Sequence, residues 1–282
     1  MAVSDTLELT VGARWYDIEV DFEGSANSSF YNGFGAPDTQ QFGSNLSAQY
    51  APGNANGYPD KAASDGVIGK ATLAWNKSED VMMYVTWSEG FRPGLLNRPV
   101  GSKSPDGSYS VKPEVKSDEV TNYEFGWKAV LNDGALRFNG SVFMVDVSGL
   151  QSTIFDPSIV NLFFSDNAAD AEILGAEGDF MYVTGNGLML SGAFSLLDTE
   201  ITKSLVPTAD VVTGSDLAFA PGFQGNLGAR KEWGLSSGNT GHWQAQFVHS
   251  TKSYSDIMAP NKATQASYSF ANIRAGVSND SW

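Results

Sequence analysis

The chain has 282 residues, no cysteine and a formal net charge of −15. The absence of cysteine excludes disulfide frameworks, thiolate metal sites and cysteine nucleophiles, and the acidic balance excludes a nucleic-acid binder, which needs a basic surface. Hydrophobic residues make up 41% and aromatic residues 12% of the sequence, which is too rich for a disordered chain. The chain is therefore expected to fold.

The sequence contains no run of about 18 apolar residues, so no transmembrane helix is expected. A membrane β-strand needs only about ten residues with every second one apolar, and a mean hydropathy of −0.20 does not exclude that pattern. The first six residues contain neither a basic nor an apolar segment, so we expect no signal peptide. For an exported protein this would mean an N-terminal truncation.

The feature that decides the fold class is alternation with a period of two residues, repeated about ten times along the chain. It begins at residues 7–15 and recurs near 67–76, 81–88, 121–131, 136–144, 174–182, 188–196, 223–230, 243–247 and 271–277. In each segment the apolar residues occupy one set of alternate positions, which suits contact with lipid. We expect the following residues to lie on a convex, lipid-facing side: Leu9, Val11, Leu73, Val85, Phe125, Trp127, Phe138 and Leu190. The other set suits a wet interior, and the candidates for a concave lumen-facing side are Arg14, Lys70, Glu124, Lys128, Arg137 and Arg230.

The links between these segments alternate in length. Short links of turn composition fall at 76–80, 132–134, 184–187 and 234–241, and long links fall between them at 23–64, 92–116, 156–167, 203–220 and 256–266. Sorting by length in this way is typical of an outer-membrane barrel, with tight periplasmic turns and long extracellular loops. A soluble β-sandwich that binds carbohydrate or mediates adhesion stays open as an alternative, although its polar faces usually carry more Lys and Glu.

Two short motifs resemble those of TonB-dependent outer-membrane receptors. The first ends an aromatic strand with Gly90, Phe91, Arg92 and Pro93. The second consists of Lys112, Pro113 and Glu114, followed by Asn122, Tyr123, Glu124 and Gly126. These residues mark strand ends, because glycine and proline release the chain from a β-ladder and an aromatic residue can sit at the headgroup level.

The resemblance implies an all-β fold: an antiparallel up-and-down transmembrane β-barrel of which residues 1–282 would form about 10 of 22 strands. Members of the family also carry an N-terminal plug with an energy-coupling box and end on a strand with a terminal aromatic residue. The resemblance therefore implies a partial barrel domain without the plug and the last strands. Its location would be the outer membrane of a Gram-negative bacterium.

The function that the resemblance implies is active uptake of a scarce solute, most often a ferric siderophore, energised by the TonB complex acting on the plug. Outer-membrane lipid and lipopolysaccharide would be the other partners, with no cofactor and no nucleic acid. A passive outer-membrane porin is the alternative, because it shares the strand pattern.

Catalysis is not expected, because no nucleophile elbow, phosphate loop or dinucleotide motif occurs. His242 and His249 lie seven residues apart on one predicted strand and so have opposite parity, which prevents them from sharing a metal ion. An acidic ladder follows the first segment and could bind divalent cations, although a solvated strand extension is the simpler interpretation: Asp17, Glu19, Asp21 and Glu23. The loops at 25–58 and 92–116 are expected to contact substrate.

Overall fold

The computed structural model describes residues 2–21, 61–97, 103–159, 163–206 and 210–279, and its main feature is one large antiparallel sheet. The strands of this sheet are β1 (Leu7–Asp21), β2 (Lys61–Asn76), β3 (Val81–Arg92), β6 (Asp118–Leu131), β7 (Leu136–Phe155), β8 (Phe163–Val183), β9 (Leu188–Ser204), β10 (Phe223–Gly234), β11 (Thr240–Ser250) and β14 (Tyr268–Ser278). Two small hairpins pair β4 (Leu95–Leu96) with β5 (Glu114–Val115), and β12 (Ser253–Tyr254) with β13 (Thr264–Gln265). Two short 3₁₀ turns, η3 (Ser236–Gly238) and η4 (Ala259–Asn261), complete the described elements.

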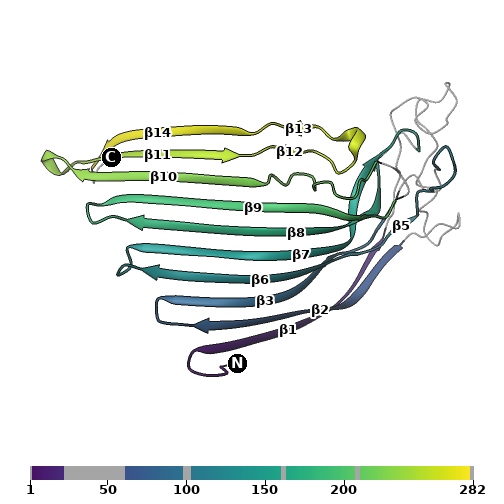
Figure 1. Cartoon of the computed structure of the whole chain (residues 1–282), viewed down its shortest axis with the longest axis horizontal. Coiled ribbons are helices and arrows are strands. Elements are labelled where there is room, and N and C mark those ends of the chain that lie inside the picture. The colour runs from purple at the N-terminus through teal and green to yellow at the C-terminus, as the bar shows by residue number, and fades with distance from the viewer. Residues whose placement is uncertain (1, 22–60, 98–102, 160–162, 207–209, 280–282) are drawn as a thin grey trace.

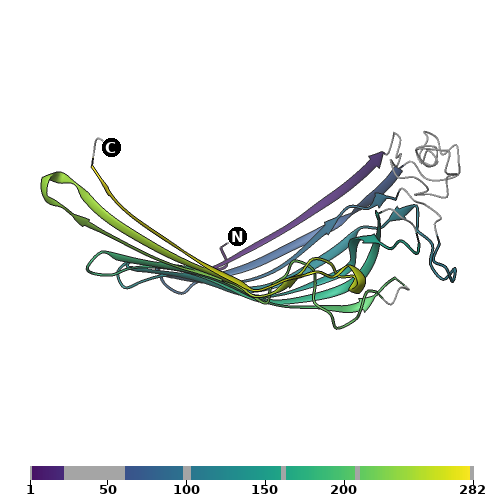
Figure 2. The same ribbon diagram turned by 90° about the horizontal axis from the view of Figure 1, so that it is seen from above.

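The strand order is β1-β2-β3-β6-β7-β8-β9-β10-β11-β14, so each strand of the sheet pairs with the next one along the chain (Figure 1). The sheet is a single curved layer that stays open, with β1 and β14 at its two edges (Figure 2). The prediction of an open up-and-down sheet of ten strands is confirmed, and a two-layer sandwich is excluded. No helix in the described part of the chain is long and apolar enough to cross a membrane.

The pairing register separates the side chains into two faces. Directly paired residues share a face, and one such row runs from Leu9 through Leu73, Val85 and Phe125 to Val142. All eight residues predicted to face lipid lie on the face of this row, which we call the apolar face. The six charged candidates Arg14, Lys70, Glu124, Lys128, Arg137 and Arg230 all lie on the opposite face, the polar face.

Aromatic rings lie across glycines of the neighbouring strand at many points in the sheet. Tyr84 pairs directly with Gly126, and Phe143 with Gly175. A Cβ at Gly175 would lie only 2.1 Å from the ring of Phe143. The same arrangement joins Tyr16 to Gly66, Trp127 to Gly140, Phe180 to Gly192 and Trp233 to Gly241. A glycine in a strand leaves a gap in the pleated surface, and the ring from the adjacent strand covers it.

Strands β7 and β8 extend well beyond their neighbours at the long-link end (Figure 1). The long link predicted at 156–167 is therefore too long, because β8 already begins at Phe163. The pairing of β7 with β8 is irregular on either side of Leu150, and Gly149 there has a φ of +65°. In a regular strand every second side chain is buried, but the consecutive residues Ala168 and Ala169 of β8 are both fully buried. This break in the alternation indicates a β-bulge.

Candidate functional site

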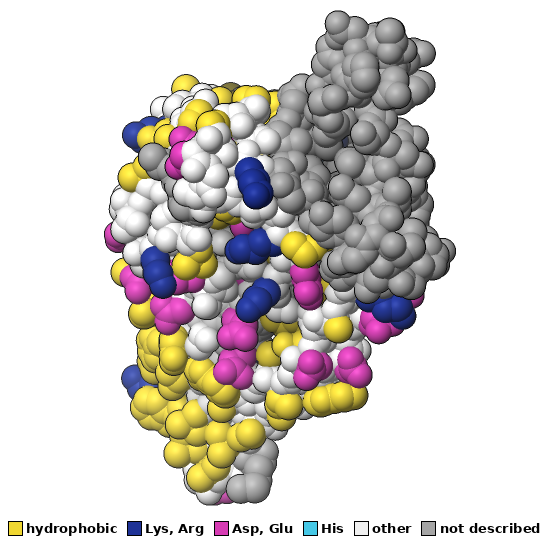
Figure 3. All heavy atoms as spheres, turned by 90° about the vertical axis from the view of Figure 1, so that its right-hand side faces the viewer, with side chains coloured by type: hydrophobic (Ala, Val, Ile, Leu, Met, Phe, Trp, Pro, Cys, Tyr) yellow, Lys and Arg dark blue, Asp and Glu magenta, His cyan; other side chains and the backbone are white. Residues whose placement is uncertain are grey.

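The long links between the strands gather at one end of the sheet, which we call the loop end, and form the candidate site (Figures 1 and 2). Viewed from this end, Lys and Arg side chains lie among Asp and Glu, with hydrophobic side chains to one side (Figure 3). Three links contribute described residues here: 93–117, 205–222 and 251–267. The long loop at 25–58, which was also predicted to contact substrate, lies outside the described residues.

The three links share one buried apolar cluster with the ends of β7, β8 and β9. We call it the loop cluster, and its members are Tyr109, Val111, Val147, Ile154, Phe164, Ala168, Ala169, Ala171, Ile201, Val206, Val211, Leu217, Ile257 and Met258. Val147, Ala171 and Ile201 are paired directly across β7, β8 and β9 on the polar face. The alternating segments predicted from the sequence do not reach these three residues, and the structure shows an apolar floor there on which the links pack.

Backbone hydrogen bonds tie the second and third links to each other. Val211 and Met258 form a β-bridge, and the N–H of Ala259 donates to the carbonyl oxygen of Asp210 at 2.8 Å. The N–H of Phe219 donates to the carbonyl oxygen of Tyr254 at 2.7 Å. The links are therefore one folded unit, because each link's backbone groups find partners in the other.

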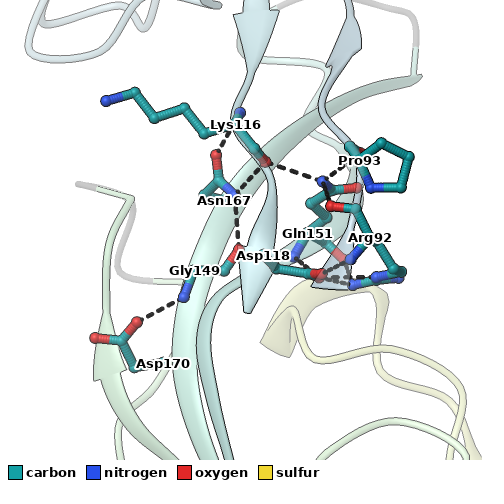
Figure 4. A network of polar contacts seen from close by, with 8 residues as sticks. All are labelled: Arg92, Pro93, Lys116, Asp118, Gly149, Gln151, Asn167 and Asp170. Atoms are coloured by element: carbon teal, nitrogen blue, oxygen red, sulfur yellow. Dashed lines mark hydrogen bonds and ion pairs between the residues drawn. The ribbon is translucent and has the colours of Figure 1, made fainter. Parts of the chain in front are cut away.

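The first link is fixed at its base by a polar network around Asp118 (Figure 4). The carboxylate of Asp118 is 1% exposed and accepts from the backbone N–H of Arg92 at 3.0 Å and from its Nε at 2.8 Å. It also accepts from the backbone N–H of Gln151 at 3.2 Å. The Nε2 of Gln151 donates to the carbonyl oxygens of Pro93 and Lys116, both at 2.9 Å. Both ends of the link are thus held to β7.

An amide from β8 completes this network. Asn167 Nδ2 donates to the carbonyl oxygens of Lys116 at 2.9 Å and Gly149 at 2.6 Å, and its Oδ1 accepts from the N–H of Lys116 at 3.0 Å. The N–H of Gly149 donates to Asp170 Oδ1 at 2.8 Å. The side chains therefore satisfy backbone groups that the irregular pairing of β7 and β8 leaves without a ladder partner.

A second anchor holds the middle of the first link against β8. Asn97, which is 3% exposed, exchanges side-chain hydrogen bonds with both the N–H and the carbonyl oxygen of Ser165, at 2.8 and 2.7 Å. Asp166, which is 1% exposed, accepts from the Tyr109 hydroxyl at 2.7 Å and from Lys112 Nζ at 3.2 Å. Burial raises the pKa of Tyr109 far above its ordinary value, and the hydrogen bond to Asp166 raises it further.

The motif residues lie in and below these anchors. Arg92 and Pro93 belong to the network at the base, Lys112 binds Asp166, and the carbonyl oxygen of Pro113 accepts from the N–H of Asn97 at 2.9 Å. Glu114 pairs with Leu96 between β5 and β4, and the ring of Phe91 stacks on Tyr16 with centroids 3.6 Å apart. Gly90, Asn122 and Tyr123 lie in the ladder between β3 and β6. The contacts of the motif residues thus hold the first link and the ladder between β3 and β6 in place.

The charged candidates on the polar face do not form one cluster. Glu124 accepts a hydrogen bond from the hydroxyl of Tyr84, whose ring covers Gly126. Arg230 contacts Glu232 and donates to Gln244 at 3.3 Å. By register, Arg14, Lys70, Lys128 and Arg137 are distributed over β1, β2, β6 and β7. A lining of the lumen by these six side chains stays a prediction.

The acidic ladder lies at the loop end of β1. Asp17, Glu19 and Asp21 share the apolar face with the strand's predicted lipid-facing residues, and Lys61 lies 2.6 Å from Glu19 and 3.2 Å from Asp21. Glu23 lies outside the described residues. A similar acidic row crosses three other strands, where Asp146, Glu172 and Glu200 are paired directly on the apolar face.

Within the described ranges, no group of three or more histidine and carboxylate side chains is placed to hold a metal ion. By register, His242 lies on the polar face and His249 on the apolar face, so the two imidazoles are not neighbours. His249 Nδ1 lies 2.7 Å from the hydroxyl of Ser269.

Sequence reasoning missed the residues that hold the loops. Asn97, Asp118, Gln151 and Asn167 carry the anchors, yet each is a single polar residue without a recurring pattern around it. The one signal available was the pair Ala168 and Ala169, which interrupts the strand alternation and coincides with the bulge.

Comparisons with known proteins agree with this architecture. The fold resembles the ferric yersiniabactin uptake receptor FyuA from Yersinia pestis (TM-score 0.67, 14% identity, 96% of this chain and 35% of that chain). It also resembles the siderophore receptor PiuA from Acinetobacter baumannii (TM-score 0.62, 18% identity, 97% and 34%) and the copper transporter OprC (TM-score 0.66, 15% identity, 96% and 37%). The chain therefore spans about a third of the length of these structures. No significant match to a curated protein was found.

The family model for the TonB dependent receptor-like β-barrel matches residues 1–282. This family consists of non-enzymatic transporters of the Gram-negative outer membrane. The chain belongs to the TonB-dependent receptor-like β-barrel family, and its described residues form a ten-stranded part of such a barrel.

Proposed function

We propose that this chain is part of a receptor barrel and that the receptor actively takes up a scarce solute. In this proposal the described residues of links 93–117, 205–222 and 251–267, which we call the loop platform, face the substrate. The supporting observation is the combination of a family match over the whole chain with a sheet that has one apolar and one polar face. In this proposal the apolar face contacts outer-membrane lipid and lipopolysaccharide, and the polar face lines the lumen, with Arg14, Lys70, Glu124, Lys128, Arg137 and Arg230.

The loop platform supports a receptor more than a passive pore. The links at the loop end pack on the polar face through the loop cluster, so they stand at the entrance of the proposed lumen rather than away from it. Pre-organised loops lose less conformational entropy when a ligand binds than free loops do. A fixed platform at the entrance therefore favours solute capture.

An iron–siderophore complex is the solute that we propose, because FyuA and PiuA are described as receptors of this kind. The copper transporter OprC has a similar fold, so fold alone does not select the metal. Energy would come from the TonB complex acting through a plug, for which residues 1–282 supply only the surrounding wall.

The test is uptake of an iron-labelled siderophore by cells that express the complete gene, compared between strains with and without the TonB complex. Saturable uptake that requires the TonB complex is expected. Uptake that rises linearly with solute concentration and does not need the complex would instead assign the chain to a passive porin. A matched variant with Asp118→Asn, which weakens the base of the loop platform, should reduce affinity for the solute more than it reduces insertion into the membrane.

A further inference from the structure

A hollow of about 390 Å³ opens along β9, β10, β11 and β14, toward their loop ends. Its size is that of a small-molecule site, for which about 300–1,000 Å³ is usual. The polar-face side chains around it are Ser195, Gln224, Asn226, Gln246, Ser250 and Tyr268. The links 205–222 and 251–267 begin or end directly beside it, so it lies below the loop platform.

Differences in side-chain size between paired strands create the hollow. Ser195 on β9 is paired with Gln224 on β10, and Ala193 is paired with Asn226. The small side chains of β9 leave space that the longer amides of β10 border without filling. The hollow is therefore part of the regular ladder and needs no loop movement to form.

The polar groups around the hollow are uncharged. Glutamine and asparagine side chains each offer a donor and an acceptor, and serine and tyrosine hydroxyls can do both. The nearest charges in the ladder are Glu177, paired with Ser195, and Asp179, paired with Ala193, both on β8. Such a lining matches ligand hydroxyl groups, which also donate and accept. In the ladder, the nearest cations on this face are Arg230 and Arg274, which are paired with Gln244 one row beyond Gln246.

Two aromatic rings form one side of this region. Tyr268 is paired with Ser250 and Phe270 with Val248, so both rings are on the polar face of β14. They are stacked with an interplanar angle of 4° and centroids 6.4 Å apart, and they are 41% and 47% exposed. A flat, exposed aromatic surface packs well against the C–H groups of a saturated ring, because its π-face is electron-rich.

We propose that this hollow binds a neutral polyhydroxylated ring, as found in carbohydrates, with Tyr268 as the stacking surface and Gln224, Asn226 and Gln246 as hydrogen-bonding partners. The proposal rests on the proposed uptake function and extends it, because it identifies a sugar ring as part of the solute. A purely apolar solute would leave the amides without partners, and a bare anionic complex would meet the carboxylates of Glu177 and Asp179, which are paired directly with Ser195 and Ala193.

The experiment is a binding titration of the 282-residue chain, solubilised in detergent, with maltotriose, cellotriose and triacetylchitotriose. Binding of at least one of these with a Kd of about 1 mM or lower is expected. Tyr268→Ala should weaken that binding about tenfold, whereas Tyr268→Phe, which keeps the ring, should retain it. Ala193→Phe, which fills the hollow, should abolish it.

The matched control for Gln246→Ala is Gln244→Ala, a glutamine on the same strand and face but outside the hollow. The first should weaken binding severalfold and the second should leave it unchanged, with folding of each variant checked by circular dichroism. Absence of binding to all three sugars, equal losses in the two glutamine variants, or stronger binding of neutral tetraglycine would overturn the proposal. Because no transport is measured, this result is independent of the uptake assay.

Discussion

At the scale of single residues, one carboxylate holds together three segments that are far apart in the sequence. Asp118 accepts from the backbone and the guanidinium of Arg92 and from the backbone of Gln151. Its 1% exposure means that no solvent replaces these partners when one is lost. Hydrogen bonds to a buried charge are stronger than those between neutral groups, so this residue should contribute more than a surface ion pair.

We expect Asp118→Asn to lower the free energy of unfolding by about 2 kcal/mol, because the Arg92 guanidinium loses its charged acceptor. The measurement is a urea titration of the refolded protein in detergent. Glu119→Gln is the matched control, because Glu119 is the exposed neighbour of Asp118, and its effect should stay within about 0.5 kcal/mol. Equal effects of the two substitutions would show that the network around Asp118 does not stabilise the loop base.

Because of Tyr109, the free energy of unfolding should depend on pH in the alkaline range. Its pKa is raised in the folded protein, first by burial and then by the hydrogen bond to Asp166, whereas an unfolded tyrosine ionises near pH 10. The unfolded state therefore loses this proton first, so the stabilisation is fully present below about pH 10 and is lost as the pH rises above it.

The urea midpoint of the wild-type protein should accordingly fall more steeply between pH 9 and 11 than that of Tyr109→Phe. The chain has ten tyrosines, so the difference between the two proteins, rather than either profile alone, isolates this one. Parallel profiles would mean that Tyr109 ionises in the folded protein as it does in the unfolded one.

At the scale of strands, pairs of an aromatic ring and a glycine decide which glycines tolerate a side chain. Gly175→Ala places a Cβ 2.1 Å from the ring of Phe143, so the ring must move, and we expect a loss of about 1–3 kcal/mol. Gly12→Ala is the control, because nothing lies within 4 Å of its Cβ position. There we expect a gain of about 0.5–1 kcal/mol from the smaller entropy loss on folding.

Thermal unfolding of the two variants gives the comparison. The expected signs are opposite, so a loss at both positions would indicate that any side chain weakens the strand. A gain at both would indicate that the ring of Phe143 moves away freely.

The sequence predicts the strands well wherever a single rule holds. The alternation predicts Leu9 and Phe125 on one face and Arg14 and Lys128 on the other, and the observed pairing register agrees. The register is strongly specified, because a shift of one strand by one residue would move each of its side chains to the opposite face. Ten strands, their order and the open edges follow from the same rule and from the alternation of link lengths.

The rule fails at the loop end, where β8 begins earlier than expected. Bulges around Leu150 and Ala168 change which parity faces inward, and alternation cannot be extended across them. The candidate site was predictable only as a location at the long links. Its anchors depend on hydrogen bonds between residues up to 68 positions apart, such as Asn97 and Ser165, and no local pattern encodes them.

At the scale of the whole molecule, one row of negative charge crosses three neighbouring strands of the sheet. Asp146, Glu172 and Glu200 are direct neighbours on three strands, and directly opposed like charges destabilise a sheet. We expect Glu172→Gln to stabilise the protein by about 0.2–1 kcal/mol at low ionic strength. The gain should shrink in 1 M salt, where the Debye length is only about 3 Å.

Denaturant midpoints at the two salt concentrations provide the measurement. Glu79→Gln, in the short link between β2 and β3, is the control and should show little change at either concentration. A gain at Glu172 that does not depend on salt would arise from packing rather than from relief of repulsion.

The shared loop cluster also limits how binding specificity can be exchanged between receptors. Link 205–222 supplies Val206, Val211 and Leu217 to the same apolar unit that receives Ile257 and Met258 from link 251–267 and Tyr109 from link 93–117. A graft of one link from a relative would therefore leave cavities or clashes in the other two. A functional graft should require that all three links are exchanged together with Val147, Ala171 and Ile201 beneath them. The loop platform should therefore be exchangeable between receptors only as a single unit.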